Sequence, residues 1–498
     1  MLVMLEKIYF LLLLFVIITK CVKTEILDDC NLPTDLIKEI QSYRPTVNRI
    51  IDSVTKGKHK GKVYNELVDF VDKFGARVSG TKNLEDSIDY LIELMKNNGI
   101  SNIRGENVTV PHWIRGEEYA QLIEPRRTKI GVLGLGSTVP TPPEGLQAEV
   151  LVVRSFEELN QPNVSAAIRG KIVVFNYQFE RYGKSVQYRS SGAAEASKHG
   201  AVAVLVKSVA PFSMYTLHTG YQRHQTGVKK IPAASITIED ANMFQRYQDR
   251  GQKIILKLNI NSETLPDAIS RNVIAEIRGS QKPNKIVVVS GHSDSWDVGV
   301  GAMDDGGGAF ISWYSLALLN DLGLKPKRTI RLILWAAEEP GFIGAQAYDK
   351  EHKNELSDFT FVMEADEGTF TPLGIEYTAG KRGGCVLKEI VKLLAPINAT
   401  KVQYSNSVGS DIAMWAQKIP IAGLLNDNRH YFWYHHSAAD TIDILDSDTL
   451  DKATAVWAVV AYVVADLRDE FPREFEDISK LTSVSLLNKL KDAQQKHN

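Results

Sequence analysis

The chain has 498 residues, of which 44% are hydrophobic and 24% are charged. This is an ordinary globular composition, long enough to bury a large core and to form two domains rather than one. The 58 Lys and Arg nearly balance the 60 Asp and Glu, giving a formal net charge of -2, so charge gives no reason to expect nucleic acid or an anionic membrane as a partner.

The N-terminus predicts entry into the secretory pathway. Lys7 precedes the apolar stretch IYFLLLLFVIIT, which is followed by KCVKTE. This pattern is typical of a cleaved signal peptide and is short for a membrane span, although an uncleaved signal anchor is the alternative. No other segment predicts stable membrane insertion. We therefore expect a secreted protein, or one that resides in the endoplasmic reticulum, Golgi or lysosome.

Sequons and cysteines fit the same route. Asn107 (NVT), Asn163 (NVS) and Asn398 (NAT) are candidate glycosylation sites. Once a signal peptide is removed, only Cys30 and Cys385 remain, too few for a disulfide scaffold. The sequence leaves open whether these two cysteines pair.

Three regions of different texture follow the N-terminus. Residues 35–100 carry apolar residues at helical spacing, as in LEDSIDYLIELMKNNG, and predict amphipathic helices. Short β-type runs such as GKIVVFNY and AVAVLV recur after the linker GSTVPTPPEG and predict an inserted β-rich domain. From residue 272 strand and helix alternate, which predicts an α/β fold with a mostly parallel sheet covered by helices. The predicted division of the chain is a signal peptide (1–24), a candidate propeptide or N-terminal lead (25–45), a main domain (46–136 and 269–470), the inserted domain (137–268) and a charged C-terminal tail (471–498).

Side chains that carry chemistry stand at the ends of the predicted parallel strands. His292 follows KIVVVSG, the pair Glu338 and Glu339 follows RTIRLILWAA, and Asp366 follows FTFVMEA. Parallel strands end at one edge of a sheet, where open α/β folds bind ligands, so we expect these side chains to converge. Asp304 lies where a glycine-rich loop meets the next helix, and we expect its side chain to join this group.

These residue types predict a metal centre. One imidazole, several carboxylates and a second imidazole from HHSAADT (435–441), without a nearby thiolate, suit catalytic zinc. Three ligating carboxylates, Asp304, Glu339 and Asp366, overcompensate one divalent ion but leave two ions one charge positive, ready for a bridging hydroxide. Asp304 is best placed to bridge. Each residue alone has a structural explanation, such as an N-cap for Asp304; their joint occurrence at strand ends favours the metal site.

The chain resembles the co-catalytic zinc peptidases, the family that includes bacterial aminopeptidases, glutamate carboxypeptidase II and the transferrin receptor. Five motifs carry the resemblance: GHSDSWD, AMDDGGG, WAAEEPG, MEADEG and HHSAADT. The likeness extends to PHWIRGEE, TPPEG, VQYRSSGA, HTG and AVWAVVAYVVAD. It implies a zinc aminopeptidase-like α/β fold with a protease-associated domain as the insertion, two zinc ions per chain and a homodimer.

The resemblance also implies roles for single residues. It assigns one zinc ion to His292 and Asp366, the other to Glu339 and His436, and the bridge to Asp304.

Two further residues receive roles beside the ligands. Glu338 is the implied general base, which takes a proton from water and returns it to the leaving amine. Asp294 is the implied acceptor that fixes the tautomer of the His292 imidazole. The family further implies a cis peptide bond between Asp304 and Asp305.

The chain departs from the wider family at residue 435, where many relatives carry Tyr immediately before the final metal-binding His. Here His435 precedes His436. We expect His436 to be the ligand because the family pattern places the ligand directly before Ser or Thr, here Ser437. His435 then donates to the oxyanion or to a substrate carboxylate. The alternatives are that His435 only packs, or that it is itself the ligand.

The implied activity is that of a secreted zinc-dependent exopeptidase, a dipeptidase or carboxypeptidase that hydrolyses unsubstituted dipeptides. The residues do not indicate which side chains it prefers. The alternatives are a broad aminopeptidase, a glutaminyl cyclase-like acyl transferase and an inactive binding module. All five implied ligands and the base are present, which favours an active peptidase over an inactive binding module. The inserted domain argues against the cyclase.

Overall fold

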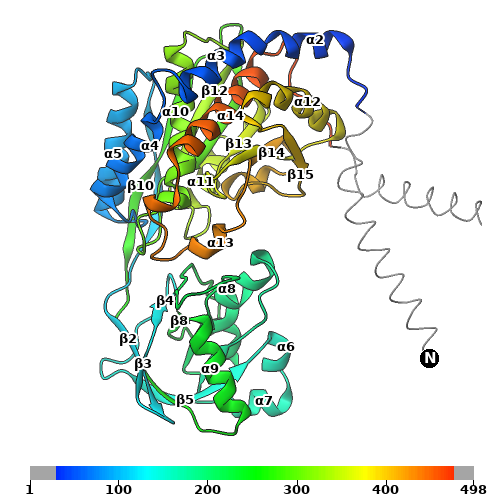
Figure 1. Ribbon diagram of the computed structural model, residues 1–498. Helices are drawn as coiled ribbons and strands as arrows, with labels where there is room; N and C mark the ends of the chain where they lie inside the picture. Colours follow the sequence, from blue (N-terminus) through cyan, green and yellow to red (C-terminus); the bar gives the residue numbers. More distant parts are fainter. Residues whose placement is uncertain (1–29, 476–498) are drawn as a thin grey trace, which may run out of the picture.

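The computed structural model describes residues 30–475. The predicted signal peptide and most of the predicted C-terminal tail lie outside these residues. The described chain forms two bodies, each built on one eight-stranded sheet (Figure 1). We call them the main body, drawn at the top of Figure 1, and the second body, drawn below it.

The sheet of the main body is parallel at its centre. In spatial order its strands are β1 (Arg104–Ile114), β10 (Glu263–Ile277), β12 (Arg328–Trp335), β11 (Lys282–His292), β13 (Phe359–Glu364), β16 (Ile421–Asn426), β14 (Pro372–Thr378) and β15 (Lys401–Tyr404). The central strands β12, β11, β13 and β16 run parallel. Antiparallel pairs join β1 to β10, β10 to β12 and β14 to β16. The predicted parallel sheet is confirmed at the centre, and antiparallel pairs extend it on both sides.

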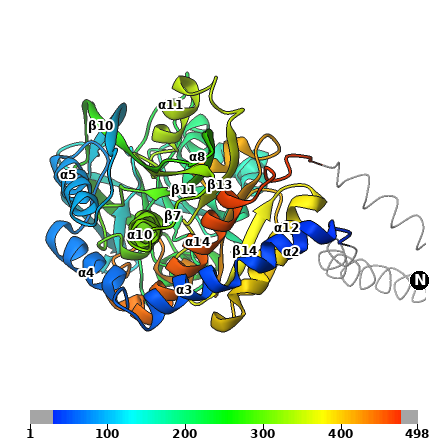
Figure 2. The same ribbon diagram turned by 90° about the horizontal axis from the view of Figure 1, so that it is seen from above.

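Helices cover both faces of this sheet. The helices of the main body are α2 (Thr34–Ser42), α3 (Arg44–Thr55), α4 (Lys62–Phe74), α5 (Lys82–Asn97), η1 (Ala302–Gly306), α10 (Gly307–Asp321), α11 (Ile343–Glu351), α12 (Lys381–Val391), η2 (Lys392–Ile397), η3 (Asp411–Trp415), α13 (Tyr431–Tyr434), η4 (Ile442–Ile444) and α14 (Ser447–Asp466). Val287 and Val289 of β11 pack with α10 and α14 on one face. Ile286 and Val288 point to the other face and pack with α11 and η3. Seen from above, α3, α14 and α10 lie side by side (Figure 2).

Local sequence explains where these helices begin. The side chain of Thr81 accepts a hydrogen bond from Leu84 N–H and caps α5, and Asp446 caps α14 by accepting from Thr449 N–H. Helix α5 is apolar on one face, as its spacing predicts, whereas nearly all of α14 is buried. The apolar run 455–465 is therefore a core helix, and no helix among the described residues is long and apolar enough to cross a membrane.

The second body is a mixed sheet with helices packed against it. Its strands are β2 (Glu118–Glu124), β3 (Thr128–Ile130), β4 (Val132–Gly134), β5 (Leu146–Val153), β6 (Ile172–Phe175), β7 (Ala203–Lys207), β8 (Ala233–Ile236) and β9 (Ile255–Ile260), and its helices are α6 (Phe156–Leu159), α7 (Pro162–Ala167), α8 (Tyr182–Lys198) and α9 (Ile238–Asp249). This sheet begins at β2, earlier than the predicted boundary at residue 137, and ends at β9. The linker GSTVPTPPEG lies between β4 and β5. The change there from helical spacing to short β-type runs therefore marks a loop inside the second body and not its boundary.

A disulfide bond joins Cys30 to Cys385, with their Cα atoms 5.6 Å apart. This pairing, which the sequence left open, ties the start of the described chain to α12.

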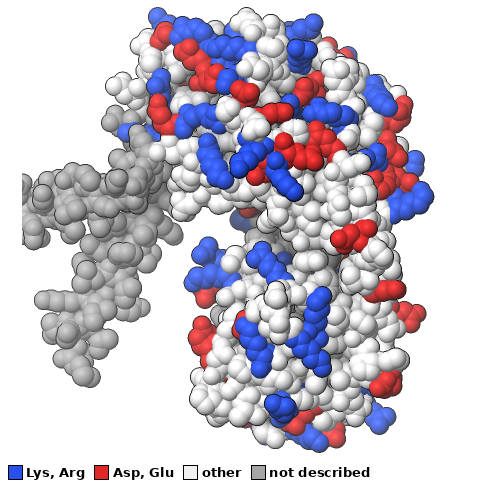
Figure 3. Space-filling model, turned by 180° about the vertical axis from the view of Figure 1, so that it is seen from behind, with Lys and Arg blue, Asp and Glu red and all other residues white. Residues whose placement is uncertain are grey.

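The surface carries mixed charge. Lys and Arg alternate with Asp and Glu over the main body in the view of Figure 3. The three sequon residues, Asn107, Asn163 and Asn398, are all exposed. Their exposure allows glycosylation, which stays a prediction at each position.

Candidate active site

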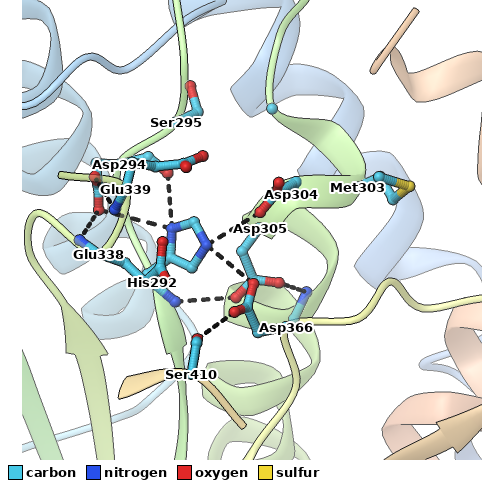
Figure 4. Close-up of polar contacts among 12 residues, drawn as sticks. His292, Asp294, Ser295, Met303, Asp304, Asp305, Glu338, Glu339, Asp366 and Ser410 are labelled. Carbon is cyan, nitrogen blue, oxygen red and sulfur yellow. Dashed lines mark hydrogen bonds and ion pairs between the residues drawn. The ribbon is translucent and has the colours of Figure 1, made fainter. Parts of the chain in front are cut away.

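The predicted site residues meet at one edge of the main sheet. His292 is the last residue of β11 and pairs in register with Trp335 at the end of β12. Glu338 and Glu339 follow β12, and Asp366 follows β13. Because these strands are parallel and adjacent, their carboxyl ends bring all four side chains together (Figure 4).

His292, Asp304 and Asp366 form a first set of donors. The His292 Nε2 atom lies 3.2 Å from Asp304 Oδ1 and 3.1 Å from Asp366 Oδ1. Two ligand atoms bound to one tetrahedral zinc ion at about 2.0–2.1 Å are separated by about 3.3 Å. The spacing of the three donors therefore fits one zinc ion, and we call this set the first metal position.

Glu339, His436 and the other oxygen of Asp304 form a second set. The His436 Nε2 atom lies 3.3 Å from Asp304 Oδ2 and 3.0 Å from Glu339 Oε2. Asp304 Oδ2 and Glu339 Oε1 are buried and accept no hydrogen bond from the residues that the structure describes, and such acceptors are costly unless a cation binds them. We call this set the second metal position; Asp304 turns one carboxylate oxygen to each of the two sets of donors.

The two adjacent histidines differ in their partners. His435 Nε2 lies 3.5 Å from Asp304 Oδ2, and Asp304, His435 and His436 have ligand atoms within 4.8 Å of one another. Of the two rings, His436 has the ion pair with Glu339, at 3.0 Å, so the geometry favours His436 as the ligand. Burial opposes the charged form of both rings. The carboxylates of Glu339 and Asp304 outweigh burial at His436 and raise its pKa to about 9. Burial and the neighbouring His436 hold the pKa of His435 well below its usual value, which keeps that ring neutral.

Asp294 lies beside His292, and its main-chain carbonyl is nearer to the imidazole than its carboxylate. The His292 Nδ1 atom lies 3.0 Å from the main-chain carbonyl of Asp294, whereas Oδ1 is at 3.7 Å. The carboxylate instead accepts the N–H groups of Glu338 (3.0 Å) and Glu339 (3.3 Å). The carbonyl therefore fixes the tautomer of His292, and the carboxylate orients the turn that carries the two glutamates.

Glu338 faces the same cavity as the metal positions, and one of its ligand atoms lies within 4.8 Å of ligand atoms of His292 and Glu339. Burial, followed by the charge of Asp366, raises the pKa of Glu338 well above its usual value. A carboxyl with a raised pKa accepts and returns a proton closer to neutral pH. This environment fits the role of general base.

Three anchors of the site were not assigned a role from the sequence. Asp440 accepts hydrogen bonds from the N–H groups of Met303 (2.7 Å) and Asp304 (3.1 Å). Asp305 accepts one from His292 N–H at 2.9 Å, and the peptide bond between Asp304 and Asp305 is cis, as the resemblance implied. Ser410 donates to Asp366 Oδ2. Asp440 and Asp305 lie inside quoted motifs, but spacing alone does not say which backbone groups they bind.

A cavity of about 430 Å³ opens over the metal positions, and both bodies line it. Arg189 and Tyr182 of α8 reach it from the second body. One Arg189 N–H donates to the Thr219 carbonyl at 2.9 Å and another to the Tyr182 hydroxyl at 2.7 Å. Arg189 Nε has no partner, and among the described residues no carboxylate forms an ion pair with this guanidinium. The cavity therefore holds a nearly buried positive charge that is free to meet an anion.

Comparison with known proteins identifies the family. Residues 272–461 match the model of Peptidase family M28. Carboxypeptidase Q of Mus musculus is 50% identical over 440 residues, which cover 88% of this chain and 93% of the relative. Carboxypeptidase Q of Homo sapiens is 49% identical over 440 residues with the same coverage.

Solved structures agree with this fold. A Peptidase M28 precursor from Shewanella amazonensis SB2B matches with a TM-score of 0.82 and 30% identity, over 88% of this chain and all (100%) of the other. A zinc aminopeptidase from Bacillus subtilis matches with a TM-score of 0.63 and 19% identity, over 84% and 98% of the two chains. The predicted family resemblance is confirmed: the chain belongs to peptidase family M28 and is a peptidase similar over most of its length to carboxypeptidase Q.

Proposed function

We propose that the protein is a metallo-exopeptidase that hydrolyses unsubstituted dipeptides, with two zinc ions bound at the two metal positions. The observation that carries the proposal is the placement of Asp304, whose two carboxylate oxygens lie 3.2 Å from His292 Nε2 and 3.3 Å from His436 Nε2. The carboxypeptidase Q relatives support a peptidase activity, and the zinc named for the Bacillus subtilis aminopeptidase supports zinc as the metal.

Bound zinc supplies Lewis acidity, which polarises the oxygen atoms of water and of the scissile carbonyl. Glu338 takes the proton of the attacking water and delivers it to the nitrogen of the leaving amine. Asp294 keeps Glu338 beside the metal positions through the N–H groups of the turn. The neutral His435 ring lines the cavity next to Asp304 and donates an N–H to the oxygen of the attacked carbonyl as negative charge develops on it.

The cavity also favours a substrate with a free carboxylate. The guanidinium of Arg189 is nearly buried and has no anionic partner within residues 30–475, and a carboxylate at the end of a short peptide would pair with it. Arg223 lines the same cavity and adds a second positive charge. A cavity of about 430 Å³ suits a small ligand.

The secretory route and the homodimer remain part of this proposal. The disulfide between Cys30 and Cys385 is typical of proteins from oxidising compartments, and the three sequons are exposed. The homodimer rests on the family resemblance.

Metal analysis with dipeptide hydrolysis tests the proposal. We expect about two zinc per chain, loss of Ser-Met hydrolysis on chelation and recovery when zinc is added back. A metal-free protein with full activity would refute the mechanism. Rapid trimming of long peptides would indicate a broad aminopeptidase, and pyroglutamate formed from an N-terminal Gln peptide would indicate a cyclase.

A further inference from the structure

The HTG motif, residues 218–220, lies in the second body and contacts both histidines of the site. The Thr219 carbonyl lies 3.2 Å from His436 Nδ1, and Thr219 N–H donates to the His436 carbonyl at 2.9 Å. The His218 Nδ1 atom lies 2.7 Å from the His435 carbonyl. His218 and Thr219 are 1% and 0% exposed, so water does not compete for these contacts.

These contacts decide which nitrogen of His436 faces the metal. His436 Nδ1 has two neighbours, the Thr219 carbonyl at 3.2 Å and Arg189 Nη1 at 3.4 Å. Arg189 Nη1 already donates to the same carbonyl at 2.9 Å. The carbonyl is the nearer neighbour of Nδ1 and only accepts hydrogen bonds, so we assign the proton to Nδ1, which donates it to Thr219. The Nε2 lone pair is then directed at the second metal position, where it lies 3.0 Å from Glu339 Oε2. The backbone of His436 is in the left-handed region, with φ +58°, which is uncommon for a residue with a side chain. The bond from Thr219 N–H holds its carbonyl in that conformation.

The 218–220 segment is itself fixed within the second body. The Thr219 hydroxyl donates to the Gly134 carbonyl at 2.8 Å, and His218 N–H donates to the Ser208 hydroxyl at 3.1 Å. Gly220 has φ +144°, and a Cβ atom at this position would lie 2.2 Å from Arg189 Cζ. Glycine therefore lets the segment pass close to Arg189 of α8, and the two hydrogen bonds hold the segment in the second body.

The first metal position has no comparable dependence. His292 receives its Nδ1 partner from Asp294, in the main body, and its Nε2 atom lies beside Asp304 and Asp366. The two positions therefore draw their supporting groups from different bodies.

We propose that the 218–220 segment is a positioning element for the metal ligand His436, so that the second metal position is completed by the second body while the first is not. This inference rests on the two-zinc function proposed above. We therefore expect a change in the segment to lower the affinity of the second metal position for zinc and to leave that of the first unchanged.

The test replaces His218, whose side chain holds the His435 carbonyl, in the full-length protein. In His218→Leu we expect the affinity for the second zinc ion to fall about 10- to 100-fold, the effect typical of groups that orient metal ligands, while the first ion is unchanged. Zinc per chain and both dissociation constants are measured by competition with a chromophoric chelator. The kcat for Ser-Met should fall at limiting zinc and return with excess zinc, with KM unchanged.

Two conservative variants separate positioning from general damage. His218→Asn places an N–H donor near the original Nδ1 position and should restore the affinity for the second zinc ion. His218→Gln places the donor farther from the backbone and should not. If His218→Leu fails to fold, the comparison of His218→Asn with His218→Gln still tests the proposal, because equal affinity for the second zinc ion in these two variants contradicts it.

His224 provides the matched control. It is another histidine of the second body bound to a main-chain carbonyl, that of Ser137 at 2.9 Å, and His224→Leu should keep both zinc ions. Equal affinity for the second ion in His218→Leu and His224→Leu would overturn the inference, as would a kcat that excess zinc fails to restore. A wild-type protein that binds fewer than two zinc ions would refute the two-zinc function before any variant is compared.

Discussion

The adjacent histidines allow the sharpest test of the metal assignment, because their partners differ. His436 Nε2 has two carboxylate neighbours, Asp304 at 3.3 Å and Glu339 at 3.0 Å. His435 Nε2 has only Asp304, at 3.5 Å. In His436→Ala the second metal position keeps two of its three protein donors. Its affinity for zinc should fall by more than about 100-fold, the upper end for residues that only orient a ligand, and zinc content should fall towards one ion per chain.

His435→Ala should behave differently. Both metal positions keep all their donors, so zinc content should stay near two per chain. The loss of one oxyanion donor should lower kcat by about 10²- to 10³-fold, or about 2.7–4 kcal/mol of transition-state stabilisation, with a smaller change in KM. A ring that only packs would leave kcat within about tenfold.

The assay combines metal analysis after gel filtration with kcat and KM for Ser-Met at saturating zinc, and thermal unfolding confirms that each variant is folded. Zinc lost in His435→Ala and kept in His436→Ala would reverse the assignment of the ligand and of the donor.

Three further predictions concern the base, the disulfide and a buried lysine. Glu338→Gln should keep both zinc ions while kcat falls at least about 10²-fold; retained turnover would place the base elsewhere. Cys385→Ser removes the bond to Cys30 and should lower the free energy of unfolding by about 2–4 kcal/mol in urea, and an unchanged value would contradict this. Burial lowers the pKa of Lys207 to about 8, from 10.5, so the unfolded chain binds more protons between these values and stability should gain from this residue as pH rises from about 8 to 10.5. In Lys207→Met this rise in the free energy of unfolding with pH should be absent. Curves of unfolding free energy against pH that have the same shape in both proteins would contradict the prediction.

The sequence was sufficient to place the candidate ligands at strand ends. A continuous apolar run followed by Gly-His or Glu-Glu is a local pattern, and parallel strands bring their carboxyl ends to the same edge of a sheet. For this reason His292, Glu338, Glu339 and Asp366 could be grouped although they are distant in the chain. The order of the strands was not needed, since the same edge receives each of them.

Details that depend on backbone geometry were not predictable in the same way. The pattern H-x-D places Asp294 beside His292, but it does not reveal that the carbonyl takes the imidazole N–H and that the carboxylate binds the turn of the glutamates. The second body also begins before the change in sequence texture, because β2, β3 and β4 join its sheet ahead of the linker.

The sequence by itself determined the residue types of the site, the family and the parallel core, because these depend on short motifs and on periodicity within single elements. Tertiary structure alone decided that Cys30 pairs with Cys385, 355 residues away, and that Thr219 binds the ring of His436, 217 residues away. The first contact depends on how helices of the main body pack and the second on how the two bodies pack against each other, and no local pattern of side chains encodes that packing.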